Sequence, residues 1–346
     1  KEKVIKISVV IPVCNVEDYV ERCVQSVMEQ TLKNIEIICM DDGSTDTSGE
    51  ILDKLASEDE RITVIHKQNT GYGNSVNIGI SKARGEYIAI VESDDFIKPT
   101  MMETLYDLSE NGTVDLVKGN FFDYFDRPGK TAQIVKNQDR AEITTIGKPF
   151  ILSEEPKMLW GHPSVWSAIY RREFLEENQI VMIEAKGGGW TDNPYFHETL
   201  CKAKSIVWTD EPLYYYRRTS LNSSSNKQGD PTIPFLRMRQ NLAVLRENDV
   251  KDVESLKCAY ARALMYLNGA YQDFDRFVSE KVFFRNAREL MEDLDQDILE
   301  RNFNFRDQVL FYDKRSPLRE LLADSPKILI YNWVPFDNPR NEGGGV

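Results

Sequence analysis

Three carboxylates stand within four residues at Glu92, Asp94 and Asp95, directly after a short apolar run. Carboxylates this close repel one another, and a divalent cation relieves that repulsion. Hard oxygen ligands of this kind suit Mg²⁺ or Mn²⁺. The alternative is a solvated acidic turn that caps the next helix, since Pro99 follows shortly.

A second acidic pair, Asp41 and Asp42, precedes Gly43 and Ser44 at the end of another apolar run. One carboxylate of such a pair can accept a hydrogen bond from a base N–H, and the other can hold a ribose hydroxyl. The pair therefore indicates nucleotide recognition. An ordinary turn has the same composition, so that alternative stays open.

Alternating strand and helix patterns over the first hundred residues decide where these carboxylates lie. Apolar runs of strand length predict four buried strands, at residues 7–11, 35–40, 62–65 and 87–91. Helices are predicted between them, at residues 20–28, from Thr47 with Glu50 at capping-box spacing, and at residues 74–83. The alternation is typical of a parallel sheet with helices on both faces, in which ligands bind beyond the carboxyl ends of the strands.

The polar residues follow those predicted strand ends. Asn15 and Glu17 come after the first strand, Asp41 and Asp42 after the second, and Lys67 after the third. The cluster of three carboxylates follows the fourth. Loops that are distant in the sequence should therefore converge on one rim of the sheet.

Beyond residue 115 the pattern is mixed and then helical. Strands are predicted at residues 116–125, 213–217 and 327–333, a short helix at 171–178, a loop at 187–190 and a linker at 220–230. From about residue 231 apolar side chains recur at helical spacing, as in Phe235, Met238, Leu242 and Leu245. We expect a catalytic domain over residues 1–228, with a nucleotide-binding half (1–115) and an acceptor half (116–228), and a mainly helical domain over 229–346.

Composition excludes several classes of protein. The formal net charge of -13 disfavours binding nucleic acid through its phosphates. No segment approaches the ~20 apolar residues of a membrane span, and the five cysteines form no C-x-x-C pair. We expect a cytoplasmic enzyme that visits the inner face of the membrane if its acceptor lies there. Neither the dinucleotide motif of a dehydrogenase nor the phosphate loop of an NTPase occurs.

Several motifs, taken in order, resemble the bacterial family 2 glycosyltransferases, which are inverting enzymes with the GT-A nucleotide-sugar-binding fold. The matching segments cover about residues 1–225, at 8–15, 41–46, 77–79, 85–88, 92–95, 170–175, 191–196 and 213–217. The resemblance implies an α/β fold with a Rossmann-like, mostly parallel central sheet, flanking helices and, after it, a helical appendage that the resemblance does not cover.

The resemblance also implies roles by position. Asp192 corresponds to the catalytic base, and Asp41 to the carboxylate that recognises the base. Glu92 and Asp94 correspond to the family's D-x-D pair, with Asp94 as metal ligand and Asp95 beside it. The expected nucleotide-sugar ligands are Pro12, Val13, Asn15, Glu17, Asp41, Asp42, Lys67, Asn77, Glu92, Ser93 and Asp94. Trp160, His162 and Trp190 are expected on the acceptor side.

The sequence departs from the family pattern at a few of these positions. Cys14 replaces an aromatic residue, Glu92 the first Asp of D-x-D, and Thr191 a Glu before the base. Ser75 or Val76 stands where an Arg is usual, so Lys67 is either a compensating cation or an ordinary surface lysine.

The expected reaction moves a sugar from a UDP-sugar to a hydroxyl of a glycan, glycoprotein or cell-surface polymer, with Mn²⁺ or Mg²⁺. Peripheral membrane association and a homo-oligomer through the C-terminal helices fit the same interpretation. The alternative is a catalytically silent sugar-nucleotide-binding or scaffold protein of the same fold.

Overall fold

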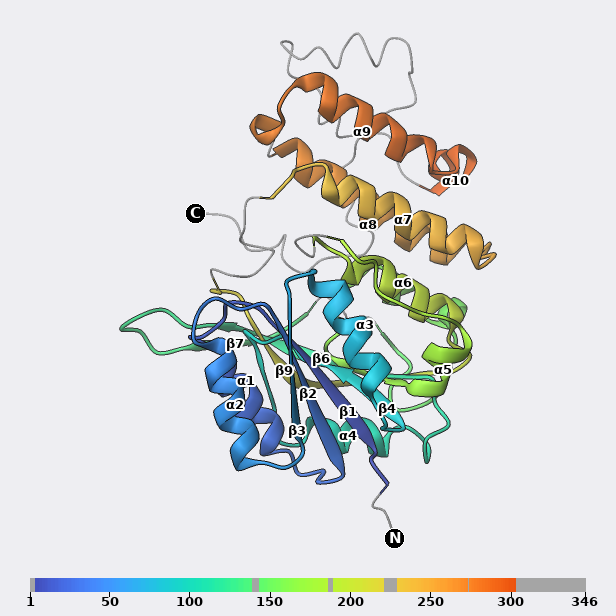
Figure 1. Ribbon diagram of the computed structural model, residues 1–346. Coiled ribbons are helices and arrows are strands. Elements are labelled where there is room, and N and C mark those ends of the chain that lie inside the picture. The colour runs from blue at the N-terminus through green and yellow to red at the C-terminus, as the bar shows by residue number, and fades with distance from the viewer. Residues whose placement is uncertain (1–3, 139–142, 186–188, 221–228, 273, 303–346) are drawn as a thin grey trace. The chain divides into compact units, whose positions relative to one another are not determined.

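The computed structural model describes residues 4–138, 143–185, 189–220, 229–272 and 274–302 (Figure 1). The chain divides into two compact units between Gly229 and Asp230, one residue from the expected boundary. Each unit is described separately. The predicted strand at 327–333 lies outside the described residues.

The first unit begins with four parallel strands, in the order β3-β2-β1-β4. Their bounds are Ile7–Val13 for β1, Ile35–Asp42 for β2, Ile62–Lys67 for β3 and Tyr87–Ile90 for β4. All four lie where the apolar runs predicted strands. The expectation that all four are buried is wrong for β3, because it is the edge strand and only Ile62 of its residues is buried.

β1 continues through Pro12, although proline cannot donate a ladder hydrogen bond. The carbonyl of Val10 accepts from the N–H of Val91, so Val10 faces β4 and Pro12, two residues on, faces the same side. The pairing with β4 ends at Val10 and Ile90. Pro12 therefore lies beyond the end of β4, where its missing N–H leaves no partner unpaired.

Three helices connect these strands: α1 (Val20–Met28), α2 (Ser48–Glu58) and α3 (Tyr72–Lys82). α1 and α2 pack side by side, and α3 packs on β1 and β2 (Figure 1). Right-handed crossovers place α1 and α2 on one face and α3 on the other, because the chain runs outward to β3 and then returns to β4. The strand order thus reverses between β1 and β4, and ligands of such sheets bind at this switch point.

Within the described residues, five more strands extend the sheet beyond β4, in a mixture of antiparallel pairs and one parallel pair, β6 with β9. They are β8 (Ala168–Arg171), β6 (Leu116–Phe125), β9 (Ile206–Arg217) and β5 (Phe96–Ile97), with β7 (Gln133–Lys136) paired to β6. β6 has the predicted bounds, and the predicted strand at 213–217 is the end of the longer β9. β5, β7 and β8 were not predicted, since segments of two to four residues carry too little periodicity.

The remaining helices of the first unit are α4 (Met101–Asp107), α5 (Arg172–Glu177) and α6 (Asp192–Lys202), with 3₁₀ turns at Leu152–Glu154 and Pro156–Leu159. α5 confirms the helix predicted at 171–178. The capping box predicted at Thr47 is wrong. The Thr47 hydroxyl instead donates to Glu17 Oε2 at 2.6 Å, so it links two loops.

The second unit is helical, as expected. It contains α7 (Ile233–Glu247), α8 (Val253–Gln272), a 3₁₀ turn at Phe274–Arg276, α9 (Glu280–Glu292) and α10 (Gln296–Asn302). Phe235, Met238, Leu242 and Leu245 are buried, as their spacing predicted. Arg239 of α7 contacts Glu289 at 2.6 Å and Asp293 at 2.7 Å, which ties α7 to the end of α9.

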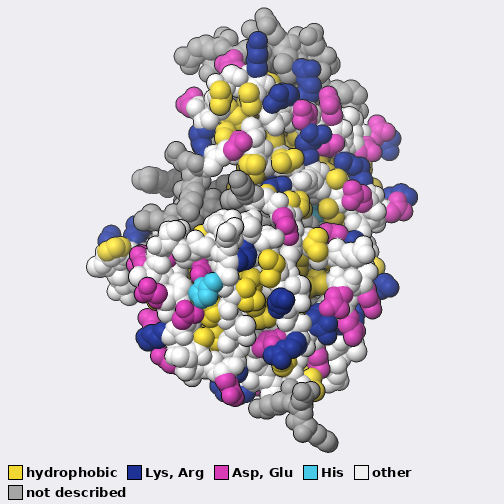
Figure 2. Space-filling model, in the orientation of Figure 1, with side chains coloured by type: hydrophobic (Ala, Val, Ile, Leu, Met, Phe, Trp, Pro, Cys, Tyr) yellow, Lys and Arg dark blue, Asp and Glu magenta, His cyan; other side chains and the backbone are white. Residues whose placement is uncertain are grey.

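Side chains of both charges are interspersed over the face drawn in Figure 2. None of the described helices combines the length and the apolar character that a membrane crossing requires. All five cysteines are free thiols, which agrees with the absence of a C-x-x-C pair in the sequence.

Candidate active site

The register of the parallel strands brings the predicted strand-end residues together. Val13 at the end of β1 is level with Asp41 of β2, and Asp41 is level with His66 of β3. Asp42 and Lys67 form the next pair along the same two strands. The convergence of these loops on one rim, expected from the sequence, is therefore present.

The loop after β1 is tied to the loop after β2 by side chains. Asn15 has a φ of 52°, a left-handed conformation that Asn tolerates, and its Oδ1 accepts from the N–H of Thr45 at 2.7 Å. Glu17 Oε2 accepts from the N–H of Thr47 at 3.0 Å. Asn15 and Glu17, predicted as nucleotide ligands, thus build the lip beside Pro12 and Val13. Their contact with a nucleotide stays a prediction.

Asp41 is 6% exposed and both of its oxygens accept hydrogen bonds. Oδ1 accepts from the N–H of Ser44 at 3.0 Å, and Oδ2 lies 2.7 Å from His66 Nδ1. Burial acts to raise the pKa of Asp41, but the hydrogen bonds from Ser44 and His66 outweigh it and lower that pKa below its usual value. Asp41 is therefore ionised at neutral pH, as a carboxylate that accepts from a base N–H must be.

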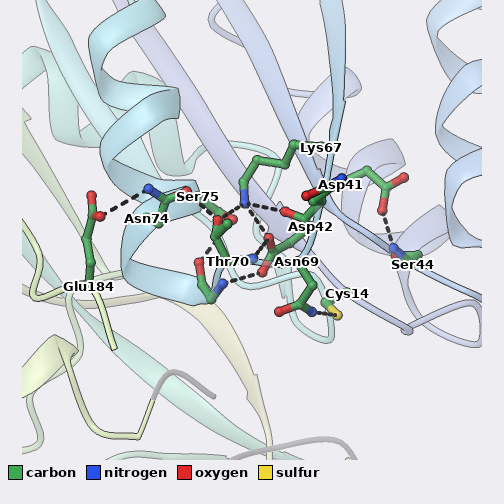
Figure 3. A network of polar contacts seen from close by, with 12 residues as sticks. Cys14, Asp41, Asp42, Ser44, Lys67, Asn69, Thr70, Asn74, Ser75 and Glu184 are labelled. Atoms are coloured by element: carbon green, nitrogen blue, oxygen red, sulfur yellow. Dashed lines mark hydrogen bonds and ion pairs between the residues drawn. The ribbon is translucent and has the colours of Figure 1, made fainter. Parts of the chain in front are cut away.

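Asp42 anchors the loop between β3 and α3 (Figure 3). Its oxygens accept from the N–H groups of Thr70 and Gly71, both at 2.9 Å, and from the Lys67 ammonium. Lys67 also donates to the Gln68 carbonyl and the Thr70 hydroxyl. The ammonium donors of Lys67 are thus used within the loop. This geometry does not support Lys67 as a substitute for the arginine that the family pattern places before Asn77.

The side chain of Asn77 forms hydrogen bonds with a segment that is distant in the sequence. Its amide donates to the Met182 carbonyl at 2.9 Å, and its Oδ1 accepts from the N–H of Met182 at 2.8 Å. A Cβ at Gly73 would lie 2.1 Å from the Ile183 carbonyl oxygen, so only glycine allows this approach. Asn77 was predicted to bind the nucleotide-sugar, but in the structure it holds residues 182–184 against α3.

Glu92 and Asp192 lie within electrostatic reach of each other. Burial, together with the charges of Asp94 and Asp192, raises the pKa of Glu92 to about 8, although the hydrogen bond from Tyr72 acts to lower it. The Tyr72 hydroxyl donates to Glu92 Oε1 at 2.5 Å. Burial, Glu92 and then Asp192 likewise raise the pKa of Tyr72. Three carboxylates from two predicted motifs, Glu92 and Asp94 from one and Asp192 from the other, are thus close enough to act on one another.

Tyr72 was not predicted as a site residue. It stands in the first turn of α3, directly after Gly71 of the loop that Asp42 anchors. Its position just beyond a strand-end loop was the only signal in the sequence, and that signal does not distinguish it from neighbouring residues.

Asp95 is held inside the protein. It is 1% exposed, and its oxygens accept from the N–H of Arg217 at 2.7 Å and from the Tyr214 hydroxyl at 2.8 Å. The Arg217 guanidinium donates to the Asp94 carbonyl at 2.8 Å. Asp95 therefore fixes the backbone that presents Asp94, together with the buried Ser93. This geometry does not support the prediction that Asp95 binds a metal.

The remaining carboxylates are suited to share a metal with a substrate. Among the described residues no group of three His, Cys, Asp or Glu side chains could hold a metal ion without other ligands. Mg²⁺ commonly binds one or two carboxylates and takes its other ligands from substrate phosphates and water. Asp94 and Glu92 fit such a site only if a diphosphate completes it.

The residues predicted on the acceptor side lie in different settings. His162 belongs to an aromatic cluster, with ring centroids 5.4 Å from Tyr216 and 5.8 Å from Trp166. Trp166 stacks on Tyr214 at 4.2 Å, which links this cluster to Asp95. Trp190 has a φ of 61° and lies two residues before Asp192, while Trp160 ends a 3₁₀ turn. Acceptor contact by Trp160, His162 and Trp190 stays a prediction.

The sheet, with carboxylates at its switch point, defines an α/β protein. The fold matches the crystal structure of S. aureus TarS 1–349 in complex with UDP-GlcNAc, with a TM-score of 0.69 and 18% identity over 85% of this chain and 82% of that one. The protein thus has the GT-A fold that the resemblance implied.

The sequence comparisons identify the family. The model for glycosyl transferase family 2 matches residues 8–178. Glycosyltransferase GlyG of Streptococcus pneumoniae serotype 4 is 36% identical over 219 residues, which are 62% of this chain and 71% of GlyG. The uncharacterized glycosyltransferase EpsJ of Bacillus subtilis is 33% identical over 61% of this chain and 60% of its own length. This chain belongs to glycosyltransferase family 2, and it is a glycosyltransferase.

Proposed function

We propose that this enzyme transfers a sugar from a UDP-sugar to a hydroxyl group of a glycan, glycoprotein or cell-surface polymer, with inversion at the anomeric carbon. The observation that carries the proposal is that the carboxylates of Asp94 and Asp192 both act on Glu92. Glu92 lies beyond the end of β4 and accepts a hydrogen bond from Tyr72. The matches to family members and to a fold that TarS uses with UDP-GlcNAc support it.

Asp41 favours uridine as the nucleoside. An ionised carboxylate accepts hydrogen bonds and cannot donate them. Uracil offers an N3–H to such an acceptor, whereas the ring N3 of cytosine carries no hydrogen. Asp41 is level with Val13 at the rim, and this position beside the lip supports its assignment as the acceptor for the base.

Asp94, with Glu92, would hold Mn²⁺ or Mg²⁺ together with the diphosphate of the donor. The metal would neutralise the charge that develops on the departing diphosphate. The protein's part is to keep Asp94 in place, which the Arg217 contact to the Asp94 carbonyl and the two hydrogen bonds of Asp95 accomplish.

Asp192 would take the proton of the acceptor hydroxyl as its oxygen bonds to the anomeric carbon and the bond to the diphosphate breaks. It is the first residue of α6, an 11-residue helix. The positive end of the helix dipole favours the ionised carboxylate, which is the form that a base requires. One displacement of this kind inverts the anomeric configuration.

A donor screen tests this proposal. The protein is incubated with Mn²⁺ and a panel of UDP-, GDP- and CDP-sugars, and release of nucleotide is measured with and without bacterial glycan acceptors. We expect turnover with at least one UDP-sugar and loss of turnover when EDTA removes the metal. Turnover confined to GDP- or CDP-sugars would contradict the assignment of uridine, and metal-independent turnover would contradict the role of Asp94.

The predicted cellular setting is separate from this chemistry. Work in the cytoplasm at the inner membrane face, and assembly through the C-terminal helices, stay predictions. Fractionation of cells and light scattering of the purified protein would test them.

A further inference from the structure

His66 lies between two carboxylates from different elements. Its Nδ1 is 2.7 Å from Asp41 Oδ2 on β2, and its Nε2 is 3.0 Å from Asp53 Oδ1 on α2. The His66 side chain is 49% exposed and that of Asp53 is 64% exposed, whereas Asp41 is buried. The ring therefore connects a buried carboxylate of the site to one in solvent.

The two contacts favour the charged form of the ring. A neutral imidazole carries one N–H and can donate to one carboxylate only, whereas imidazolium donates to both. The hydrogen bond to Asp41 and then that to Asp53 raise the pKa of His66. Asp41 from β2 and Asp53 from α2 are the charged groups that act on the ring.

The packing leaves the Asp41 carboxylate little freedom. A Cβ at Gly49 of α2 would lie 3.0 Å from Asp41 Oδ2 and 3.5 Å from His66 Cε1, so α2 packs closely against this carboxylate. Oδ2 is thus enclosed by His66 and α2. Oδ1 accepts from Ser44 in the loop that also contacts Asn15. His66 is thus the side chain that contacts Oδ2, while the backbone N–H of Ser44 contacts Oδ1.

We propose that His66 is a positioning residue that orients the base-recognising carboxylate of Asp41, and that nucleotide affinity therefore depends on pH over a range that Asp53 sets. The inference rests on the proposed function, in which Asp41 contacts the base of the donor. Asp41 remains the residue that touches the nucleotide, and His66 acts through it.

The expected direction follows from the proton count. Below its pKa, His66 donates to Asp41 and Asp53 together. Above that pKa one proton remains for two carboxylates, so Asp41 loses its donor in one of the two neutral tautomers. Nucleotide binding that depends on a fixed Asp41 is therefore favoured on the acidic side of the His66 titration.

Titration calorimetry of the full chain with UDP and Mn²⁺ between pH 5.5 and 8.5 tests the inference. His66→Ala removes the donor, and His66→Asn keeps an amide donor near the position of Nδ1 without titrating. Asp53→Asn leaves the ring but removes one carboxylate that raises its pKa. Glu58→Gln, an exposed residue of the same helix, is the matched control. The UDP phosphates and Glu92 titrate in every variant, so they cancel in the ratio of variant to wild-type dissociation constants.

We expect His66→Ala to weaken UDP binding about fivefold at low pH, the effect of one lost hydrogen bond, and the deficit to become smaller as pH rises, because neutral His66 donates to Asp41 in only one of its two tautomers. His66→Asn should restore the low-pH affinity. Asp53→Asn should move the pH at which affinity changes to a lower value. In steady-state kinetics over a range of donor concentrations, His66→Ala should raise the KM for the donor and leave kcat unchanged.

Three results would overturn the inference. They are a His66→Ala ratio of one at every pH, a ratio that does not change with pH, and an Asp53→Asn profile that coincides with the wild type. If His66→Ala does not fold, the Asp53→Asn profile decides the question alone, because Asp53 is exposed. A wild-type protein that binds no UDP at any pH would instead refute the proposed function, and this outcome is visible before any variant is compared.

Discussion

At the scale of single residues, the positions of the carboxylates could be predicted from the sequence. Which of them form hydrogen bonds within the protein, instead of contacting a ligand, could not. The charges of Asp94 and Asp192 both act on Glu92, so these three carboxylates lie near one another, and their roles stay predictions. Asp95 and Asn77 matched motif positions equally well, yet their side chains fix the Asp94 backbone and the 182–184 segment. Residue type and spacing cannot reveal these structural hydrogen bonds, because the bonds form with residues such as Arg217 and Met182 that are distant in the sequence.

Glu92 gives a prediction about metal binding. Its pKa, raised to about 8, means that it is largely protonated at pH 7, and a carboxylate must lose its proton to bind a metal. Binding of Mn²⁺ with UDP should therefore release protons at pH 7 and strengthen as pH rises through 8. Calorimetry in buffers with different ionisation enthalpies measures the released protons. An absence of proton release at pH 7 would show that Glu92 is either already ionised or not involved.

Tyr72→Phe is expected to shift this dependence. The hydroxyl of Tyr72 lowers the pKa of Glu92, so its loss should raise that pKa further. The pH at which kcat/KM for the donor rises should then move upward, with about tenfold lower activity at pH 7. Tyr266→Phe, in the helical unit, is the comparison variant. An unchanged pH profile in Tyr72→Phe would mean that the hydrogen bond to Glu92 is absent during turnover.

At the scale of elements, the four parallel strands and the switch point could be predicted because each apolar run was bounded by turn residues. The second half of the sheet was predicted only in part, since β5 and β8 are defined by pairing with β9 and β4 rather than by local pattern. The start of α6 at Asp192 was also missed, because the glycines at 187–189 indicated a loop. The position of Asp192 at the N-terminus of α6 therefore became known only from the structure.

Asn77→Ala tests the role of α3 as a support for the segment that leads toward Asp192. The loss of both contacts with Met182 should loosen residues 182–184, so we expect a lower Tm and a lower kcat. UDP affinity should stay within about twofold, since no nucleotide contact is lost. Binding and thermal unfolding measured on the same preparation separate the two effects. If the variant instead bound UDP tenfold more weakly with an unchanged Tm, Asn77 would have to contact the nucleotide directly.

At the scale of the whole molecule, the family could be inferred from the order of weak motifs over about residues 1–225, and the comparisons confirm it. The charged groups and loops of the proposed donor site all lie in the first unit. The helices of the second unit could be predicted from the spacing of apolar residues. The role of this unit could not be predicted, because an amphipathic helix has the same pattern whether it covers a core or a partner.

A shortened protein that ends at Gly229 is expected to bind UDP with Mn²⁺ as the full chain does, because the donor residues belong to the first unit. Transfer to a natural acceptor should fall if the helices select the acceptor, and light scattering would show whether they also carry assembly. Loss of UDP binding by a shortened protein that retains its circular dichroism spectrum would place part of the donor site in the helical unit.

The most direct test of the account is nucleotide release by Asp192→Asn with the donor that the screen identifies. Glu198→Gln is the matched control, because it lies on the same helix and loses only an ion pair with Lys202. Removal of a general base should lower kcat at least about 100-fold while UDP affinity stays within about twofold of the wild type. Turnover by Asp192→Asn equal to that of Glu198→Gln would contradict the assignment of Asp192 as the base.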